Sequence, residues 1–207
     1  MIDFDAMARA EVSTTPFRFM KASGTLSREQ AGAVRRDYPA IAKSGYHPLS
    51  QFKAEGAFAE LIADLQSPRL AEILSEKLGL DLKDKPRMIT IRKLSKEGDG
   101  RIHNDSASKI ATMLIYLNDD WNDAEGGAIR ALNGPDSMDD YAAEVSPVAG
   151  NVFAFARSET SWHGHPPFAG ERYVVQTTFL VSEEALARKE NRGGLQLLLK
   201  KLNPFAR

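Results

Sequence analysis

Residues 162–178 read WHGHPPFAGERYVVQTT, and this stretch decides how the rest of the chain is interpreted. It joins a histidine-rich turn to a run of β-branched and aromatic residues. An earlier H-N-D triplet places His103 and Asp105 two residues apart, so both side chains leave the same face of an extended segment. We therefore expect His103 and Asp105 to meet His163 in one polar site.

Two imidazoles and one carboxylate suit a borderline divalent metal ion. When they occupy one face of an octahedron they leave open positions, as in non-heme Fe(II) oxygenases. Zinc also accepts two histidines and one carboxylate, with water as the fourth ligand. The H-x-D triplet is weak evidence by itself, because short polar triplets occur by chance in loops.

Arg172 supplies the context that the triplet lacks. It opens the β-rich run 172–181, where Val174, Gln176 and Thr178 share its face of the strand. A buried arginine needs an anion, because an unpaired buried charge is very costly. Its planar fork matches a carboxylate through two parallel hydrogen bonds. We therefore expect Arg172 to anchor an acidic ligand beside the metal.

Five motifs occur in one order between Met88 and Val181. They are H-N-D at 103–105, I-Y-L-N at 115–118, E-G-G-A-I-R at 125–130, G-N-V-F-A-F at 150–155 and W-H-G-H-P-P-F-A-G-E-R at 162–172. Together they resemble the Fe(II)/2-oxoglutarate-dependent oxygenase superfamily and, within it, the prolyl-hydroxylase-like branch.

The resemblance implies a role for each matching residue. Iron would be held by His103, Asp105 and His163, and 2-oxoglutarate would be bound by Arg172, Tyr116, Gln176 and Ile129. Beyond the metal ligands it implies no catalytic residue. Fe(II), 2-oxoglutarate and O2 are the implied cofactor and co-substrates, with ascorbate as an optional addition. The implied reaction hydroxylates an unactivated C–H bond of a peptidyl, amino-acid or other small-molecule substrate and releases succinate and CO2.

The expected fold class is α+β. Apolar periodicity and turn residues predict helices at 57–66 and 68–78 and a further helix that begins with Ser27 as its N-cap. Strands are predicted at 88–94, 109–117, 126–132, 151–156 and 172–181. The family resemblance makes these strands a double-stranded β-helix (jelly roll), with N-terminal buttressing helices and a C-terminal helical tail, 183–207. We expect one domain, 1–207, with a catalytic core at about 86–181.

Three segments are expected to be loops. Residues 41–51 contain Gly45 and Pro48, and 136–144 form an acidic, solvated loop. The glycine-containing segment 95–101 is expected to be a mobile turn or flap. Substrate contacts are expected from 96–100 and 119–125.

Composition sets further limits on function. The 207 residues carry a net charge of −1, which gives no electrostatic reason to expect nucleic acid or an anionic membrane as a partner. Cysteine is absent, so disulfides and thiolate sites are excluded. No apolar run reaches the ~20 residues of a membrane span, and no signal-peptide core is found. A cytoplasmic location is expected, and a homodimer is left open.

Several alternatives stay open at this point. His165 could replace His163 as the ligand or lie near the 2-oxoglutarate pocket. A cupin-like isomerase or binding module could use the same ligands without 2-oxoglutarate, and a relative that has lost catalysis is a third hypothesis. Arg92 stands where some relatives place a tyrosine, which suggests a different substrate or co-substrate environment, but no role is predicted for it. The C-terminal leucines 195–202 could pack on the barrel, against a second copy or on a membrane surface.

Overall fold

Two antiparallel sheets and a layer of helices make up the protein. The computed structural model describes residues 1–122 and 125–191. The major sheet has the strand order β1 (Val12–Ser13), β2 (Phe19–Ala22), β8 (Val152–Ala156), β5 (Lys109–Tyr116), β10 (Gly170–Leu180), β4 (Arg87–Ser95) and β3 (His47–Pro48). The minor sheet has the order β7 (Tyr141–Val145), β6 (Ile129–Leu132) and β9 (His163–Gly164).

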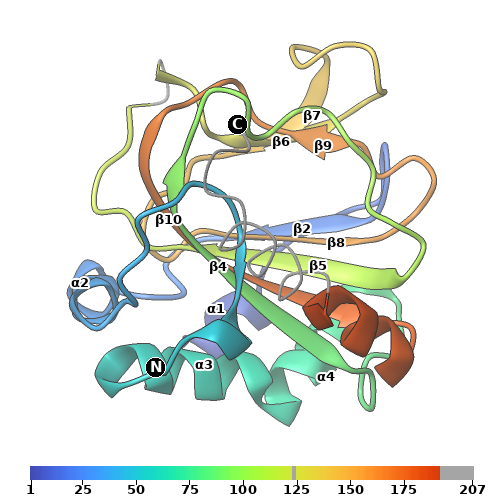
Figure 1. Ribbon diagram of the computed structural model, residues 1–207. Coiled ribbons are helices and arrows are strands. Elements are labelled where there is room, and N and C mark those ends of the chain that lie inside the picture. Colours follow the sequence, from blue (N-terminus) through green and yellow to red (C-terminus); the bar gives the residue numbers. More distant parts are fainter. Residues whose placement is uncertain (123–124, 192–207) are drawn as a thin grey trace.

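Figure 1 shows the minor sheet above the major sheet, and the long helices below the major sheet. The helices are α1 (Phe4–Ala8), α2 (Arg28–Arg36), α3 (Gly56–Gln66) and α4 (Pro68–Leu78), with a 3-10 helix η1 (Leu49–Gln51). Residues 183–191 are also helical. This arrangement confirms the predicted α+β class, the double-stranded β-helix and the buttressing helices.

Helix boundaries follow the capping residues found in the sequence. Ser27 Oγ accepts a hydrogen bond from Gln30 N at 3.1 Å, and Gln30 Oε1 accepts one from Ser27 N at 2.8 Å. This reciprocal pair is the predicted capping box, which satisfies two backbone donors that the helix start would leave unpaired. Pro68 begins α4, and Gly79 ends it in the left-handed conformation at φ 66°.

Alternation along the strands divides the apolar residues between two cores. Met113 and Val175 face the helices and pack with Leu61 and Leu74 of α3 and α4 in the first core. The second core lies between the sheets and contains Phe19, Leu114, Tyr116, Ile129, Phe153 and Val174. Because both faces of the central strands are buried, these strands have nearly continuous apolar runs in the sequence.

The structure differs from the sequence-based expectation in four short segments. The predicted loop 41–51 contains β3 and η1, and the strand pair β1–β2 was not expected. The predicted acidic loop 136–144 ends in strand β7, where Glu144 pairs with Arg130 of β6. These strands are short or polar, so they carry little periodicity. The strand predicted at 126–132 begins at Ile129, because the two preceding glycines have φ of 86° and 79°.

The predicted C-terminal tail can be followed only to residue 191. Helix 183–191 agrees with the expected start of that tail. The alternatives for leucines 195–202 lie outside the described residues.

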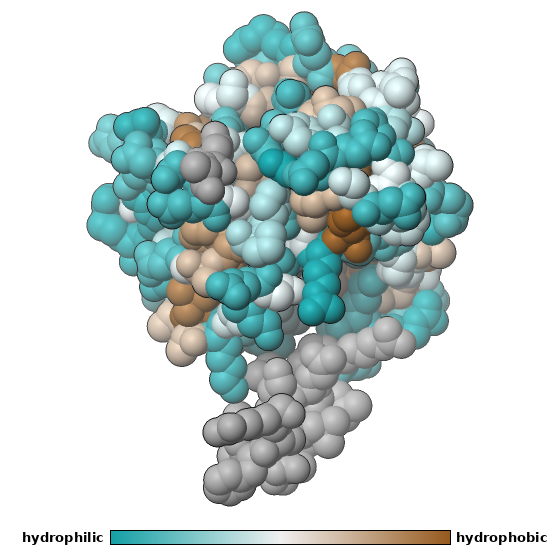
Figure 2. All heavy atoms as spheres, turned by 90° about the horizontal axis from the view of Figure 1, so that it is seen from above, coloured by the Kyte–Doolittle hydropathy of each residue, from teal (hydrophilic) through white to brown (hydrophobic). Residues whose placement is uncertain are grey.

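The described surface is predominantly polar. Among residues 1–122 and 125–191, the exposed large hydrophobic side chains are Tyr141 and Val181. Figure 2 shows hydrophobic residues in small separate spots on the face seen from above. Within the same residues, no helix combines the length and apolar character that crossing a bilayer requires.

Candidate metal centre and its cavity

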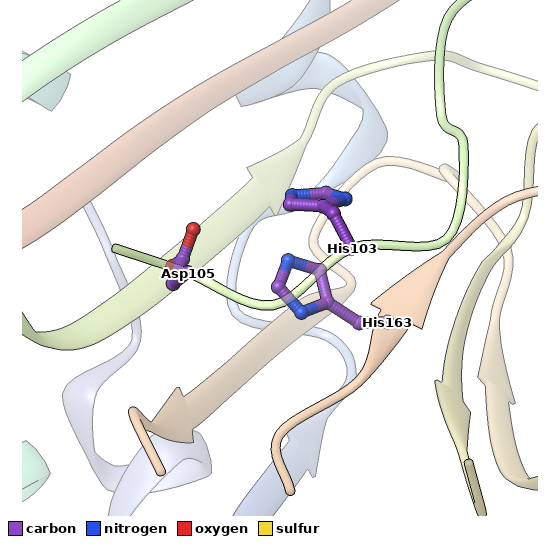
Figure 3. A group of neighbouring side chains, drawn as sticks. All are labelled: His103, Asp105 and His163. Atoms are coloured by element: carbon purple, nitrogen blue, oxygen red, sulfur yellow. The ribbon is translucent and has the colours of Figure 1, made fainter. Parts of the chain in front are cut away.

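Three side chains that are distant in sequence meet where the minor sheet faces the major one. His103 and His163 form an isolated antiparallel bridge, in which each backbone N–H donates to the other residue's carbonyl at 3.0 Å. Asp105 follows two residues after His103. One candidate ligand atom from each of the three residues lies within 4.8 Å of the other two. Figure 3 shows the three side chains arranged around one small space.

Backbone carbonyls orient both imidazoles. Nδ1 of His103 lies 2.9 Å from the carbonyl oxygen of Arg101, and Nδ1 of His163 lies 2.9 Å from that of Ser161. A carbonyl can only accept, so each Nδ1 carries the proton and each Nε2 keeps its lone pair. This second contact is the usual way in which a protein fixes the tautomer of a histidine ligand.

Asp105 is buried and held as a carboxylate. Lys109 Nζ donates to its Oδ1 at 2.6 Å, and Thr112 Oγ1 donates to its Oδ2 at 2.7 Å. Burial alone raises the pKa of Asp105, but the charge of Lys109 and the hydrogen bonds from Lys109 and Thr112 lower it by more, so the pKa is lowered overall. Neither Lys109 nor Thr112 was predicted, because their contacts depend on the turn that closes from Lys109 N to Ser106 O.

His163 is held neutral. Burial and then the neighbouring His103 lower the pKa of His163 to about 4. A neutral imidazole is the form that binds a metal. The site therefore offers one carboxylate and two correctly oriented imidazoles, a donor set that fits Fe(II) and also fits zinc.

A cavity of about 460 Å³ joins this cluster to Arg172. Arg172 is 1% exposed, and its Nε donates to the carbonyl of Gly127 at 2.8 Å. Its Nη2 donates to the hydroxyl of Tyr116 at 3.3 Å. No carboxylate pairs with Arg172 among the described residues. A buried guanidinium that lacks such a partner is suited to an anionic ligand.

Glycine geometry presents the Gly127 carbonyl to Arg172. Gly127 has φ 79°, and a Cβ there would lie 2.6 Å from the Trp121 ring. Trp121 stacks on Phe168 at a ring-centroid distance of 4.5 Å and donates from Nε1 to the carbonyl of Gly126 at 2.9 Å. Only glycine fits between this aromatic pair and Arg172 without strain.

The remaining predicted site residues lie around the same cavity. Ile129 and Gln176 line it, and Gln176 donates from Nε2 to Thr178 Oγ1 at 3.2 Å. Tyr116 is fully buried next to Arg172 and is not among the residues that line the cavity. Burial raises the pKa of Tyr116, so its hydroxyl stays protonated.

His165 lines the cavity but does not join the three-residue cluster. Its Nδ1 lies 2.8 Å from the carbonyl of Pro166, and its buried Nε2 has no hydrogen-bond partner in the described part of the chain. Burial and then the charge of Arg172 lower the pKa of His165 to about 3, which keeps the ring neutral. The alternative in which His165 lies near the Arg172 pocket thus agrees with the geometry. Arg92, for which no role was predicted, also lines this cavity.

The fold and the cluster together define a class, the double-stranded β-helix proteins with two histidines and one carboxylate at the centre. Within that class, residues 90–180 match the family model described as the 2OG-Fe(II) oxygenase superfamily. A search of curated proteins finds no match.

Solved structures share the fold at low sequence identity. A Pseudomonas putida prolyl-4-hydroxylase matches with a TM-score of 0.53 and 20% identity, covering 86% of this chain and 96% of that one. A viral collagen prolyl hydroxylase from Paramecium bursaria Chlorella virus-1, solved as a 2OG complex, matches with a TM-score of 0.54 and 15% identity, covering 80% and 96%. A Trichoplax adhaerens prolyl hydroxylase, solved with a peptide fragment of the hypoxia inducible factor oxygen degradation domain, matches with a TM-score of 0.53 and 14% identity, covering 82% and 86%.

Family match and fold agree with each other. The resemblance to the superfamily, and to the fold of its prolyl-hydroxylase-like branch, is confirmed. The family implies Fe(II), 2-oxoglutarate and O2 as cofactor and co-substrates. Ascorbate stays a prediction.

Proposed function

We propose that this protein is a dioxygenase that uses Fe(II) and 2-oxoglutarate to hydroxylate an unactivated C–H bond of a small molecule or peptide. In this proposal His103, Asp105 and His163 hold the iron. Support comes from their mutual distances and from the orientation of both imidazoles by backbone carbonyls. Since these ligands would occupy only three positions, 2-oxoglutarate and O2 could bind to the same ion.

Arg172 would hold the distal carboxylate of 2-oxoglutarate. Its Nε is already committed to the Gly127 carbonyl, and Tyr116 supplies a neighbouring protonated hydroxyl. Ile129 would form the apolar wall beside the carbon chain, and Gln176 would lie deeper in the cavity. Arranged in this way, the cavity would bind the co-substrate in one pose with its keto acid end toward the metal.

Iron held by these residues would, with its co-substrates, supply the oxidation. One 2-oxoglutarate and one O2 would give succinate and CO2, and one oxygen atom would enter the C–H bond of the substrate as a hydroxyl group. The residues of this chain would bind and orient the co-substrate and the substrate, and would exclude water from the cavity. Asp105 would contribute its negative charge to the metal site. Related halogenases have a small residue at this position, which leaves room for a halide ion, so a carboxylate here favours hydroxylation over halogenation.

One observation carries the proposal: a buried arginine, with no anionic partner among the described residues, lies in the same cavity as the three candidate ligands. A cupin-like metalloprotein would need the ligands but would have no use for this carboxylate clamp. For that reason the oxygenase is favoured over the cupin-like isomerase or binding module.

Succinate release from 2-oxoglutarate, measured with Fe(II) and O2, tests the proposal, and binding of 2-oxoglutarate to the Mn(II)-loaded protein gives a second readout. We expect His163→Ala to abolish Mn(II) binding and turnover. Arg172→Gln should keep Mn(II) binding and weaken 2-oxoglutarate binding by about 10- to 100-fold, as expected for a charge-assisted pair. Arg69→Gln, at an exposed position on α4, is the matched control. A wild-type protein that binds Mn(II) but neither binds nor turns over 2-oxoglutarate would promote the cupin-like alternative.

Other parts of the proposal concern the setting of the site. We propose that residues 1–207 act as one domain with the catalytic core at about 86–181. A cytoplasmic location, and the absence of nucleic-acid and membrane partners, stay predictions. The oligomeric state stays open, with a homodimer as one alternative.

A further inference from the structure

The cavity contains a second buried arginine, Arg92 of β4. Arg92 is 7% exposed and lines the cavity. In the sheet it pairs with Val174 of β10, which pairs in turn with Tyr116 of β5. These three residues therefore share the inner face of the sheet, on the side that bears Arg172.

Arg92 is poorly satisfied by the described part of the protein. There its Nε has no hydrogen-bond partner, and Nη1 lies 3.4 Å from Ser95 Oγ. Its nearest carboxylate is Asp99, with Oδ2 at 3.7 Å from Nη2. The guanidinium carbon lies 4.2 Å from the centroid of the Tyr46 ring. Both polar contacts are long for hydrogen bonds, so this buried cation keeps binding capacity for a further anion.

His165 adds a second unsatisfied group to the same cavity. It is 4% exposed, and its Nε2 is without a partner among the described residues. Its Nδ1 is committed to the carbonyl of Pro166, so Nε2 of the neutral ring presents a lone pair. The backbone holds the ring in place, since His165 N donates to the Gly100 carbonyl at 2.8 Å.

Arg172 has no carboxylate partner among the described residues, and Arg92 has only the 3.7 Å contact with Asp99, so the cavity offers binding sites for two anions. The distal carboxylate of 2-oxoglutarate accounts for Arg172 under the proposed function, on which this inference rests. We propose that Arg92 binds the carboxylate of the substrate and that His165 Nε2 accepts a hydrogen bond from an N–H group on the same molecule. The substrate class that fits both groups is a small carboxylate with a neighbouring amine, as in a free amino acid. An internal peptide segment has no main-chain carboxylate to offer Arg92.

Asp99 offers a way to separate this role from a structural one. It lies in the turn that closes from Asp99 N to Lys96 O at 2.8 Å, and its Oδ2 accepts from Lys96 N at 3.2 Å. If Arg92 only anchors this turn, losing either member of the Arg92–Asp99 pair has the same effect. If Arg92 binds the substrate, Asp99 competes with the substrate carboxylate, so the loss of Arg92 raises the KM for the substrate and the loss of Asp99 does not.

The test is succinate release by the full chain with Fe(II), O2 and 2-oxoglutarate, in the presence of single L-amino acids or of the matching L-amino acid amides. We expect at least one free amino acid to accelerate release, while its amide, which lacks the carboxylate, does not. Arg92→Gln should raise the KM for that amino acid by about 10- to 100-fold, while the apparent affinity for 2-oxoglutarate changes much less. Asp99→Asn should lower the amino acid KM or leave it unchanged, and Arg69→Gln is the matched arginine control.

Four results would overturn the proposal. They are equal acceleration by acid and amide, a raised KM in both Arg92→Gln and Asp99→Asn, acceleration only by a peptide with blocked ends, and succinate release that no amino acid accelerates. A wild-type protein that neither binds 2-oxoglutarate nor releases succinate before any amino acid is added would instead refute the proposed function itself.

Discussion

Asp105 shows how single residues prepare the site. Both of its oxygens are already fixed, one by the Lys109 ammonium and the other by the Thr112 hydroxyl. A carboxylate held in this way loses little freedom when it takes up a cation. Contacts behind a metal ligand typically change metal affinity by 10- to 100-fold.

Replacing Thr112 with valine tests that contact. Thr112→Val keeps the shape of the side chain and removes the hydrogen bond to Asp105, so we expect Mn(II) affinity to fall about tenfold. Thr177→Val is the matched control, because Thr177 is also buried but its hydroxyl has no partner among the described residues. Calorimetric Mn(II) titration measures both variants. Equal affinity in the two would show that the Thr112 hydroxyl does not support the ligand.

Two buried histidines predict a pH dependence of stability. The pKa values of His163 and His165 are lowered to about 4 and about 3, whereas an unfolded histidine titrates near 6.5. Between these values the unfolded chain binds more protons, so stability is complete above about pH 7 and is lost as the pH falls. For chelator-treated protein we expect the free energy of unfolding to drop by about 1–2 kcal/mol per histidine between pH 7 and pH 5.

Urea unfolding at the two pH values measures this drop. His165→Gln should show a smaller drop than wild type, and His47→Gln should keep the wild-type drop because both buried histidines remain. An identical drop in all three proteins would contradict the contribution assigned to His165.

The residues that the sequence grouped into one candidate site lie around one cavity, because their signal is local. Spacing by two placed His103 beside Asp105, and strand alternation placed Arg172 on the face of Gln176. Lys109 and Thr112 were not predicted, since their contacts with Asp105 depend on a turn that the sequence does not encode locally. Arg92 was singled out in the sequence, but without a role.

At the scale of elements, Gly100 at the end of the turn 96–100 lines the cavity and packs on His165. Gly100 makes this approach possible: it has φ 78°, and a Cβ there would lie 2.3 Å from the His165 ring. Gly98 in the same turn has nothing within 4 Å of its Cβ position among the described residues. A substitution at Gly100 therefore changes both the packing on His165 and the flexibility of the turn, whereas a substitution at Gly98 changes only the flexibility.

Substitution of each glycine by alanine makes the comparison. Gly100→Ala should lower the free energy of unfolding by about 1–3 kcal/mol, from backbone strain and the clash with His165, and should weaken 2-oxoglutarate binding. Gly98→Ala should stay within about 0.5 kcal/mol of wild type. Denaturant unfolding and 2-oxoglutarate titration of the Mn(II)-loaded protein provide the measurements. Similar losses in both variants would contradict a specific role for Gly100.

Longer elements were predicted well and short ones poorly. The predicted helix at 68–78 agrees with α4 because a proline and a glycine mark its ends. The central strands were predicted because both of their faces are buried, which gives them long apolar runs in the sequence. The pair β1–β2 and strand β7 were missed. β1 has only two residues, and β2 and β7 pair with β8 and β6 in other parts of the chain, which a window of a few residues cannot show.

At the scale of the molecule, the cavity joins the two sheets. His163 belongs to β9 of the minor sheet, whereas Arg172 and Arg92 belong to β10 and β4 of the major sheet. A metal and a co-substrate that bind together would therefore connect elements that otherwise meet mainly through the second core. Ligands that bind only the folded state stabilise it by mass action.

Thermal unfolding tests this connection. We expect Mn(II) with 2-oxoglutarate, each at about 100 times its Kd, to raise the Tm by about 10–20 °C relative to ligand-free protein. In Arg172→Gln the increase from Mn(II) should remain and the further increase from 2-oxoglutarate should disappear. An unchanged 2-oxoglutarate effect in Arg172→Gln would contradict the clamp.

The tight packing of Trp121 against Gly127 gives the protein an optical reporter of its own. The chain has two tryptophans. Trp162 adjoins the candidate ligand His163, and Trp121 lies behind the carbonyl that holds Arg172. A paramagnetic metal should quench the emission of Trp162 first, whereas co-substrate arriving at Arg172 should shift the emission of Trp121. Single-tryptophan variants would thus let one follow, in real time and without labels, the order in which the two ends of the cavity are filled.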